Sequence, residues 1–131
     1  MHVLVPVDRS DASTRALRFG AELADRFDAD FSVVHVTEER TEKTERLLSR
    51  TRTVLEEVGT GCEPEVVLAE KISESGGARR VGDLLLDLAE ERGYDHVVMG
   101  RHGGGRLERF VLGSASEVVL EEGDVPVTLI P

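Results

Sequence analysis

Five short runs of apolar, mostly β-branched residues are separated along the chain by longer amphipathic segments. The runs lie at residues 3–7, 31–36, 65–68, 96–99 and 127–130. Continuous apolar runs of this length, bounded by polar residues, glycine or proline, indicate strands that are buried on both faces. We therefore predict five strands, the first ending at Val7 and the last at Ile130.

The longer segments carry the spacing of amphipathic helices. Ser10 is a predicted N-cap, and the apolar face of the helix that follows it comprises Ala16, Gly20, Leu23, Ala24 and Phe27. A second helix is predicted over residues 41–58, with its apolar face at Leu47, Leu48, Thr51, Val54, Leu55 and Val58. A third helix carries Val81, Leu84, Leu85, Leu88 and Ala89 and ends at Gly93, and a short fourth helix covers residues 114–122.

The strict alternation of strands and helices predicts an α/β fold. Buried strands joined by helical crossovers favour a doubly wound parallel sheet with helices on both faces. The 131 residues suffice for one such domain, over residues 1–131, and no linker or internal repeat divides them. In sheets of this kind ligands bind beyond the carboxyl ends of the strands, so the residues that follow each strand are the candidates for function.

Charge and cysteine content narrow the class of protein. With 16 basic and 26 acidic residues the net charge is −10, which argues against binding nucleic acid or an anionic membrane through general surface charge. Cys62 is the single cysteine, so no internal disulfide can form. The apolar runs are too short for a signal peptide or a membrane span. We expect a soluble, cytoplasmic protein.

The basic residues are almost all arginine. Only Lys43 and Lys71 are lysine among the 16 basic residues. Abundant carboxylates with almost no lysine are consistent with a halophilic surface, on which concentrated salt screens the repulsion between like charges. An acidic protein from an arginine-biased genome gives the same composition, and both interpretations remain open.

Glycines cluster directly after the fourth predicted strand. Gly100, Gly103 and Gly113 allow close backbone approach to a ligand, and the helix that starts at Ser114 directs its free N–H groups forward. The segment also carries three arginines (Arg101, Arg106 and Arg109) against Glu108 alone. These features are typical of an anion site, commonly for phosphate. The alternative is a glycine-rich surface loop followed by a capping box from Ser114 to Glu117.

Other phosphate-binding patterns do not fit. A Walker-type loop requires Gly-Lys-Ser/Thr, and no lysine lies near these glycines. A dinucleotide fingerprint follows the first strand, where this chain has Asp8-Arg9-Ser10. A phosphate-accepting receiver domain needs an aspartate after strand three and a lysine after strand five, and neither is present.

The pattern Gly100-x-x-Gly103, followed after nine residues by Gly113-Ser114, resembles the nucleotide-binding motif of the universal stress protein family, in its ATP-binding branch. The opening residues 3–10, the segments 34–36 and 98–100 and the closing residues 126–130 resemble the same family in the same order. The resemblance implies a sheet order of 3-2-1-4-5. The stretch from Glu70 to Gly82 departs from the family by its length, and it is expected to be a loose loop or a lid.

The resemblance also implies a binding site. Asp8 and the backbone of Val36 would hold the adenine and ribose of ATP, with Pro6, Val7 and Met99 lining the pocket. The phosphates would be wrapped by Gly100, Gly103, Gly113, Ser114, Ala115 and Ser116, with Arg101 and His102 as further phosphate contacts. A divalent ion, Mg²⁺ or Mn²⁺, would be held by the phosphates. None of the histidines has the spacing of a metal site of the protein itself.

Three functions remain open on the sequence. The first is an ATP-binding regulatory module that acts as a homodimer, joined through the edge strand Val127–Ile130, and reports stress to an unidentified protein partner. The second is at most a slow ATPase or phosphotransferase, because no residue is an evident base for hydrolysis. The third is a nucleotide-free dimer that acts by protein contacts alone.

Overall fold

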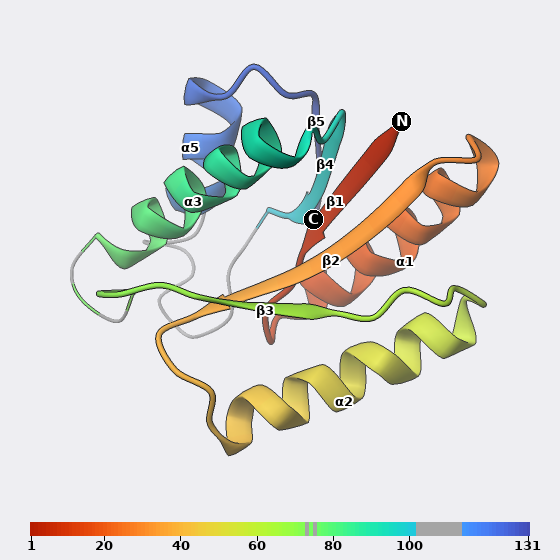
Figure 1. Ribbon diagram of the computed structural model, residues 1–131, viewed down its shortest axis with the longest axis horizontal. Coiled ribbons are helices and arrows are strands. Elements are labelled where there is room, and N and C mark those ends of the chain that lie inside the picture. The colour runs from red at the N-terminus through yellow and green to blue at the C-terminus, as the bar shows by residue number, and fades with distance from the viewer. Residues whose placement is uncertain (73, 75, 102–113) are drawn as a thin grey trace.

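The computed structural model describes residues 1–72, 74, 76–101 and 114–131 (Figure 1). Its strands are β1 His2–Pro6, β2 Asp30–Thr37, β3 Glu65–Leu68, β4 His96–Gly100 and β5 Val127–Ile130. Its helices are α1 Asp11–Arg26, α2 Glu42–Glu57, α3 Gly77–Arg92 and α5 Ser114–Glu122. The strands are parallel and lie in the order β3-β2-β1-β4-β5, which confirms the predicted doubly wound α/β fold.

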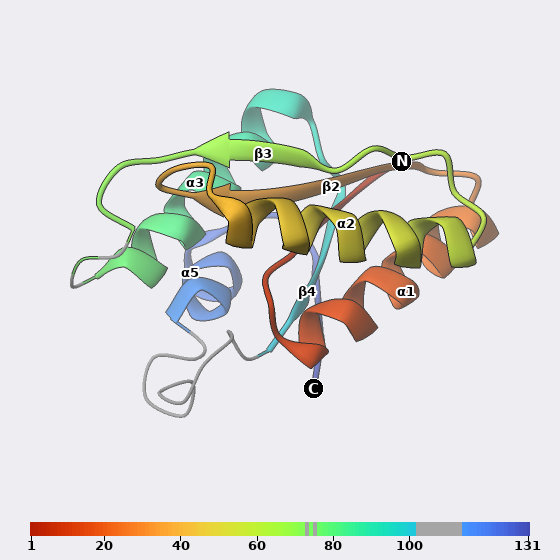
Figure 2. The ribbon, with the colours of Figure 1, turned by 90° about the horizontal axis from the view of Figure 1, so that it is seen from below.

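Helices cover both faces of the sheet because consecutive strand residues point to opposite sides. On one face Val3, Val5 and Val33 pack against α1 and α2. On the other face Leu4 and Val34 pack against α3 and α5. Figure 2 shows α1 and α2 lying side by side along their face. None of the helices in the described ranges is both long enough and apolar enough to cross a membrane.

The helix ends differ from the sequence prediction. Ser10 is the N-cap of α1, as predicted, and its Oγ accepts a hydrogen bond from the Ser13 N–H at 3.1 Å. Phe27 and Val58, predicted on the buried faces, are instead C-cap residues with 62% and 36% of their surface exposed. The prediction was wrong there because α1 ends at Arg26 and α2 at Glu57, one residue before each of these positions, although the apolar spacing continues.

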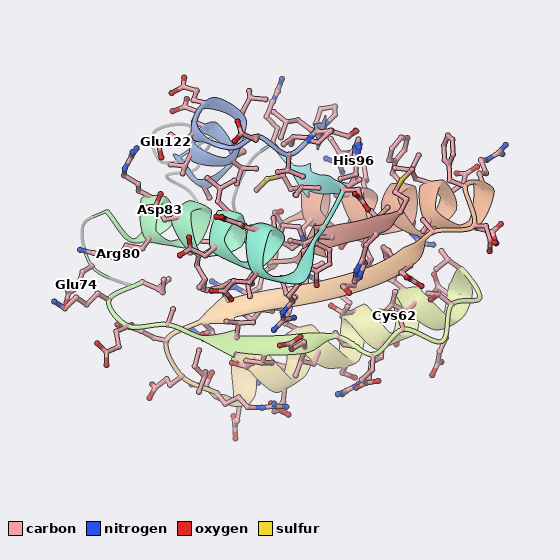
Figure 3. All side chains as sticks on the ribbon, turned by 45° about the horizontal axis from the view of Figure 1, so that its top comes forward. Cys62, Glu74, Arg80, Asp83, His96 and Glu122 are labelled. Carbon is pink, nitrogen blue, oxygen red and sulfur yellow. The ribbon has the colours of Figure 1, made fainter. Side chains whose placement is uncertain are left out.

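The segment between β3 and α3 is shorter than the expected loop from Glu70 to Gly82, because α3 already begins at Gly77. A side chain at Gly77 would put its Cβ 1.6 Å from the Ile72 carbonyl oxygen, so only glycine fits this close approach. Arg80, on the first turn of α3, donates a hydrogen bond to the Lys71 carbonyl at 2.8 Å (Figure 3). These contacts tie the segment to the helix.

Salt has opposing effects on this surface. The described residues form seven arginine–carboxylate pairs, all at least partly exposed, and such pairs contribute about 0–1 kcal/mol each and weaken in salt. The net charge of −10 repels itself, and salt relieves that repulsion. A halophilic surface predicts a Tm that rises from dilute buffer to molar salt. A Tm that stays level or falls would support the alternative of an arginine-biased genome.

Candidate functional site

A cleft of about 310 Å³ opens where β1 and β2 end, at the edge of the sheet at which ligands of doubly wound folds bind. This volume lies at the lower end of the range for small-molecule pockets, about 300–1,000 Å³. Its walls come from the turn after β1, the end of β2, the start of α2 and the segment after β3. The lining residues are Asp8, Arg9, His35, Val36, Thr37, Glu38, Glu39, Thr41, Lys43, Thr44, Leu47 and Ile72.

Asp8 lines the cleft, and one of its carboxylate oxygens is hydrogen-bonded within the protein. Its Oδ1 accepts hydrogen bonds from the Ser10 N–H at 2.7 Å and from the Ser10 hydroxyl at 2.6 Å. Within the described part of the chain, Oδ2 has no hydrogen-bond donor. The turn therefore fixes the carboxylate and leaves one oxygen able to accept a hydrogen bond from a ligand hydroxyl or amino group.

Val36 presents its backbone beyond the end of β1. The last β1–β2 pair is Pro6 with Val34, and Val34 also accepts a hydrogen bond from the Val7 N–H at 2.8 Å. In a strand, alternate residues direct both N–H and C=O to the same side, so Val36 directs both groups toward β1 as Val34 does. Because β1 has ended at Pro6, this donor and acceptor face the region next to Asp8.

The end of β4 lies against the start of α1. A Cβ added at Gly100 would be 3.0 Å from both the Ala12 carbonyl carbon and the Ser13 nitrogen. Ser13 in turn accepts a hydrogen bond on its Oγ from the Asp8 N–H at 2.8 Å. Gly100 and Asp8, which are far apart in sequence, therefore both lie against the first turn of α1.

The start of α5 lies near the same end of β4. The buried Ser116 hydroxyl donates to the Arg101 carbonyl at 3.4 Å, and the Arg101 N–H donates to the Ile130 carbonyl at 2.8 Å. Gly82 of α3 lets α5 approach closely, because a Cβ there would be 2.8 Å from the Ala115 carbonyl oxygen. The contact with α3 thus sets where the N-terminal amides of α5 lie.

The other predicted site residues that the structure describes are not among those that line the cleft. Pro6 ends β1 and is half-buried. The side chains of Val7 and Met99 are buried in the cores on opposite faces of the sheet, so their predicted role as pocket lining stays a prediction. His102, Gly103 and Gly113 lie outside the described residues. Ser114 is the first residue of α5.

Replacing Gly100 by alanine is expected to destabilise the fold by about 1–2 kcal/mol even without ligand, because the new Cβ presses on the backbone of α1. Urea denaturation of the ligand-free variant measures this loss. The control is Gly61→Ala, at a position with open space around the added methyl group, where no loss is expected. Unchanged stability of the Gly100 variant would contradict the packing explanation and leave ligand approach as the reason for this glycine.

Sequence reasoning missed most of the cleft lining. It placed Asp8 and Val36 together, but it did not single out Glu38 and Glu39, which lie between β2 and α2, or Lys43 in the first turn of α2. The signal was available, because these residues follow the carboxyl end of a strand just as Asp8 does. His35, which also lines the cleft, has its Nδ1 2.7 Å from the Val7 carbonyl oxygen.

Cys62, outside the cleft, has the environment of an unreactive thiol. Its Sγ donates a hydrogen bond to the Phe31 carbonyl at 3.4 Å. Burial raises the pKa of the Cys62 thiol, so the reactive thiolate is disfavoured at neutral pH. Figure 3 shows Cys62 at the far end of the sheet from Glu74 and Arg80.

The parallel sheet in the order β3-β2-β1-β4-β5, with a cleft at its carboxyl end, defines a doubly wound α/β domain with a candidate ligand-binding site. Residues 1–131 match the model of the universal stress protein family. The chain belongs to this family, as the resemblance in its sequence indicated.

Relatives align along nearly the whole chain. A universal stress protein of Methanocaldococcus jannaschii is 28% identical over 142 residues, which cover 98% of this chain and 80% of that protein. One of Bacillus subtilis is 27% identical over 146 residues, which cover 98% of this chain and 97% of that protein. The structure of the universal stress protein from Archaeoglobus fulgidus in complex with dAMP is similar with a TM-score of 0.74 and 27% identity, covering 100% of this chain and 98% of that one.

Proposed function

We propose that this chain binds an adenine nucleotide, with ATP as its ligand, and that it acts as a regulatory module of the stress response. The observation that carries the proposal is the meeting of Asp8 and the Val36 backbone at one cleft, at the carboxyl end of the sheet. The similar Archaeoglobus fulgidus protein, solved in complex with dAMP, supports an adenine nucleotide as the class of ligand.

The groups at the cleft suit the base and sugar of a nucleotide. The Val36 N–H and C=O form a donor and acceptor pair, which matches the ring nitrogen and amino group on one edge of adenine. The Oδ2 of Asp8 would accept a hydrogen bond from a ribose hydroxyl or an amino group. The N-terminus of α5, near Arg101, would face the phosphates, where the helix dipole favours negative charge.

The charge of the cleft is compatible with a divalent ion on the nucleotide. Its lining carries three carboxylates, Asp8, Glu38 and Glu39, against the two cations Arg9 and Lys43. A polyphosphate at the N-terminus of α5 would bring further negative charge near a lining that already has an excess of it. We propose that Mg²⁺ or Mn²⁺, bound by the phosphates, offsets this charge and that the chain itself holds the base and ribose.

The test is to denature the purified protein and identify any released nucleotide by chromatography, followed by calorimetric titration of the empty protein with ATP. Bound ATP, or micromolar binding on titration, supports the proposal. Released ADP from protein that was loaded with ATP would favour the slow ATPase instead. Protein that is empty and stays empty with added ATP would overturn the proposal in favour of a module that acts through protein contacts alone.

We also propose that the chain forms a homodimer through β5. This strand is at one edge of the sheet, and its four residues are half-buried. Pro126 accepts a hydrogen bond from Val97 of β4, and Ile130 accepts one from Arg101, the residue after β4. By alternation the N–H groups of Val127 and Leu129 therefore point away from the sheet. An outward row of this kind is able to pair with the same strand of a second copy.

Leu129→Pro is expected to convert the dimer into a monomer, because it removes an outward N–H and leaves the bonds of Thr128 and Ile130 to β4 in place. Analytical ultracentrifugation measures the change, and circular dichroism shows that the variant is folded. A folded variant that sediments as the same dimer would exclude the β5 interface.

A further inference from the structure

His35 holds the turn that carries Asp8. It comes from β2, it is half-buried, and its Nδ1 is 2.7 Å from the Val7 carbonyl oxygen. A carbonyl oxygen can only accept a hydrogen bond, so the hydrogen must be on Nδ1. The contact therefore assigns the neutral ring to the tautomer that is protonated on Nδ1. The sequence alone does not reveal which tautomer is present.

The peptide group between Val7 and Asp8 is bound at both of its ends. Its C=O accepts the hydrogen bond from His35 in β2, and its N–H donates to the Ser13 hydroxyl of α1 at 2.8 Å. Two bonds from two different elements determine how this peptide plane is oriented. The Asp8 residue extends from the end of that plane. The bonds from Ser10 hold its Oδ1 within the turn, and the two bonds on the peptide set how the turn itself is directed.

A third hydrogen bond, from an exposed side chain, holds the turn one residue further along, and it restrains the turn less. The Arg50 guanidinium of α2 donates to the Arg9 carbonyl at 3.1 Å. Arg50 is exposed and has a long, flexible side chain, whereas His35 is half-buried and has a short one. Ordering the long Arg50 side chain costs more conformational entropy than ordering the short His35 side chain, and this cost offsets more of the free energy gained from its hydrogen bond. His35 is therefore the stronger restraint on the turn.

We propose that His35 is a positioning residue for the nucleotide site, which sets the direction of Asp8 through the Val7–Asp8 peptide. This inference rests on the proposed nucleotide binding and names a residue that controls it. By holding the turn before the ligand arrives, His35 removes an ordering cost that would otherwise reduce affinity.

Two substitutions distinguish the effect of losing the Nδ1 hydrogen bond from the effect of losing the imidazole ring. His35→Asn keeps an N–H donor at the position of Nδ1, because its amide nitrogen is also attached to Cγ. His35→Gln places its amide nitrogen one bond further out, at the position of Nε2, and loses the bond to Val7. We expect ATP affinity, measured by calorimetric titration, to fall about tenfold in His35→Gln and to stay within about threefold in His35→Asn.

A double-mutant cycle separates positioning from a general loss of structure. If His35 acts through Asp8, His35→Gln will weaken binding about tenfold in the wild type and less than about twofold in an Asp8→Asn background. Equal losses in the two backgrounds would overturn the proposal, as would equal affinities of the asparagine and glutamine variants. Urea denaturation of each variant accompanies the titrations, so a loss of folded protein is not counted as weaker binding.

The tautomer is tested without any ligand. Nitrogen-15 NMR of the histidine rings at a pH where they are neutral is expected to show His35 protonated on Nδ1. Protonation on Nε2 would contradict the bond to Val7 and the proposal with it. If the wild-type protein failed to bind ATP while His35 showed the expected tautomer, the proposed function would fail and the geometry of the turn would stand, so the two failures are distinguishable.

Discussion

Asp8→Asn is expected to weaken ATP binding about 30-fold, which corresponds to about 2 kcal/mol. The Ser10 N–H requires an acceptor at the Oδ1 position, so the asparagine must direct its oxygen there and its NH₂ group to the position of Oδ2. The ligand then meets a donor where it needs an acceptor. Because the bonds from Ser10 are kept, the fold should lose less than about 0.5 kcal/mol of stability.

Calorimetric titration with ATP measures this change, and Asp11→Asn is its matched control. Asp11 is an exposed residue in the first turn of α1, a few positions away, so its replacement removes the same charge from the same region. Equal affinity losses in both variants would mean that long-range charge, and not the Oδ2 contact, accounts for the effect. Wild-type affinity in Asp8→Asn would remove Asp8 from the site.

Leu55→Ala is expected to reduce the free energy of unfolding by about 3 kcal/mol. Leu55 of α2 is 2% exposed and packs in the core with Val5 and Val33 of the sheet. Truncation removes apolar contact and leaves a cavity, because α2 is also held by its neighbour α1 and cannot close the gap fully. A loss of this size is a large part of the stability of a domain of this length.

Urea denaturation measures the loss, and Leu68→Ala provides the comparison. Leu68 ends β3 and is 60% exposed, so the same change of side chain should alter stability by less than about 0.5 kcal/mol. Similar losses at both positions would contradict the assignment of Leu55 to the core. The pair thus tests burial with the chemistry of the substitution held constant.

Much of the fold could be predicted because local pattern and tertiary burial agree. Apolar runs such as Val3 to Val5 satisfy two covered faces of a sheet, and the structure confirms all five predicted strands. The prediction that each strand is buried on both faces was wrong for the edge strands β3 and β5, which are only partly buried. The Ser10 cap was predictable because its bond to Ser13 spans only three residues. Local contacts of this kind depend on spacing along the chain, and spacing is visible in a sequence.

The ends of the helices and the roles of the glycines could not be predicted from the sequence as well as the strands could. Phe27 and Val58 continue the apolar spacing of their helices but are C-cap residues, 62% and 36% exposed, and spacing alone does not show where a helix ends. Gly100 was predicted as a place for close approach to a ligand. In the structure the first neighbour of its missing side chain is the backbone of α1, which no pattern around Gly100 indicates.

For the candidate site, the sequence alone determined that Asp8 lies just after the first strand and that Val36 lies near the carboxyl end of the second, because both belong to short local patterns. Only the tertiary structure decided which atoms remain available. The Oδ1 of Asp8 is taken by Ser10, the Val7 carbonyl by His35 and the Asp8 N–H by Ser13. The bond from His35 joins residues 28 positions apart, and it exists because β2 pairs with β1 in one particular register. Register depends on the packing of the whole sheet, so no segment of the sequence specifies it by itself.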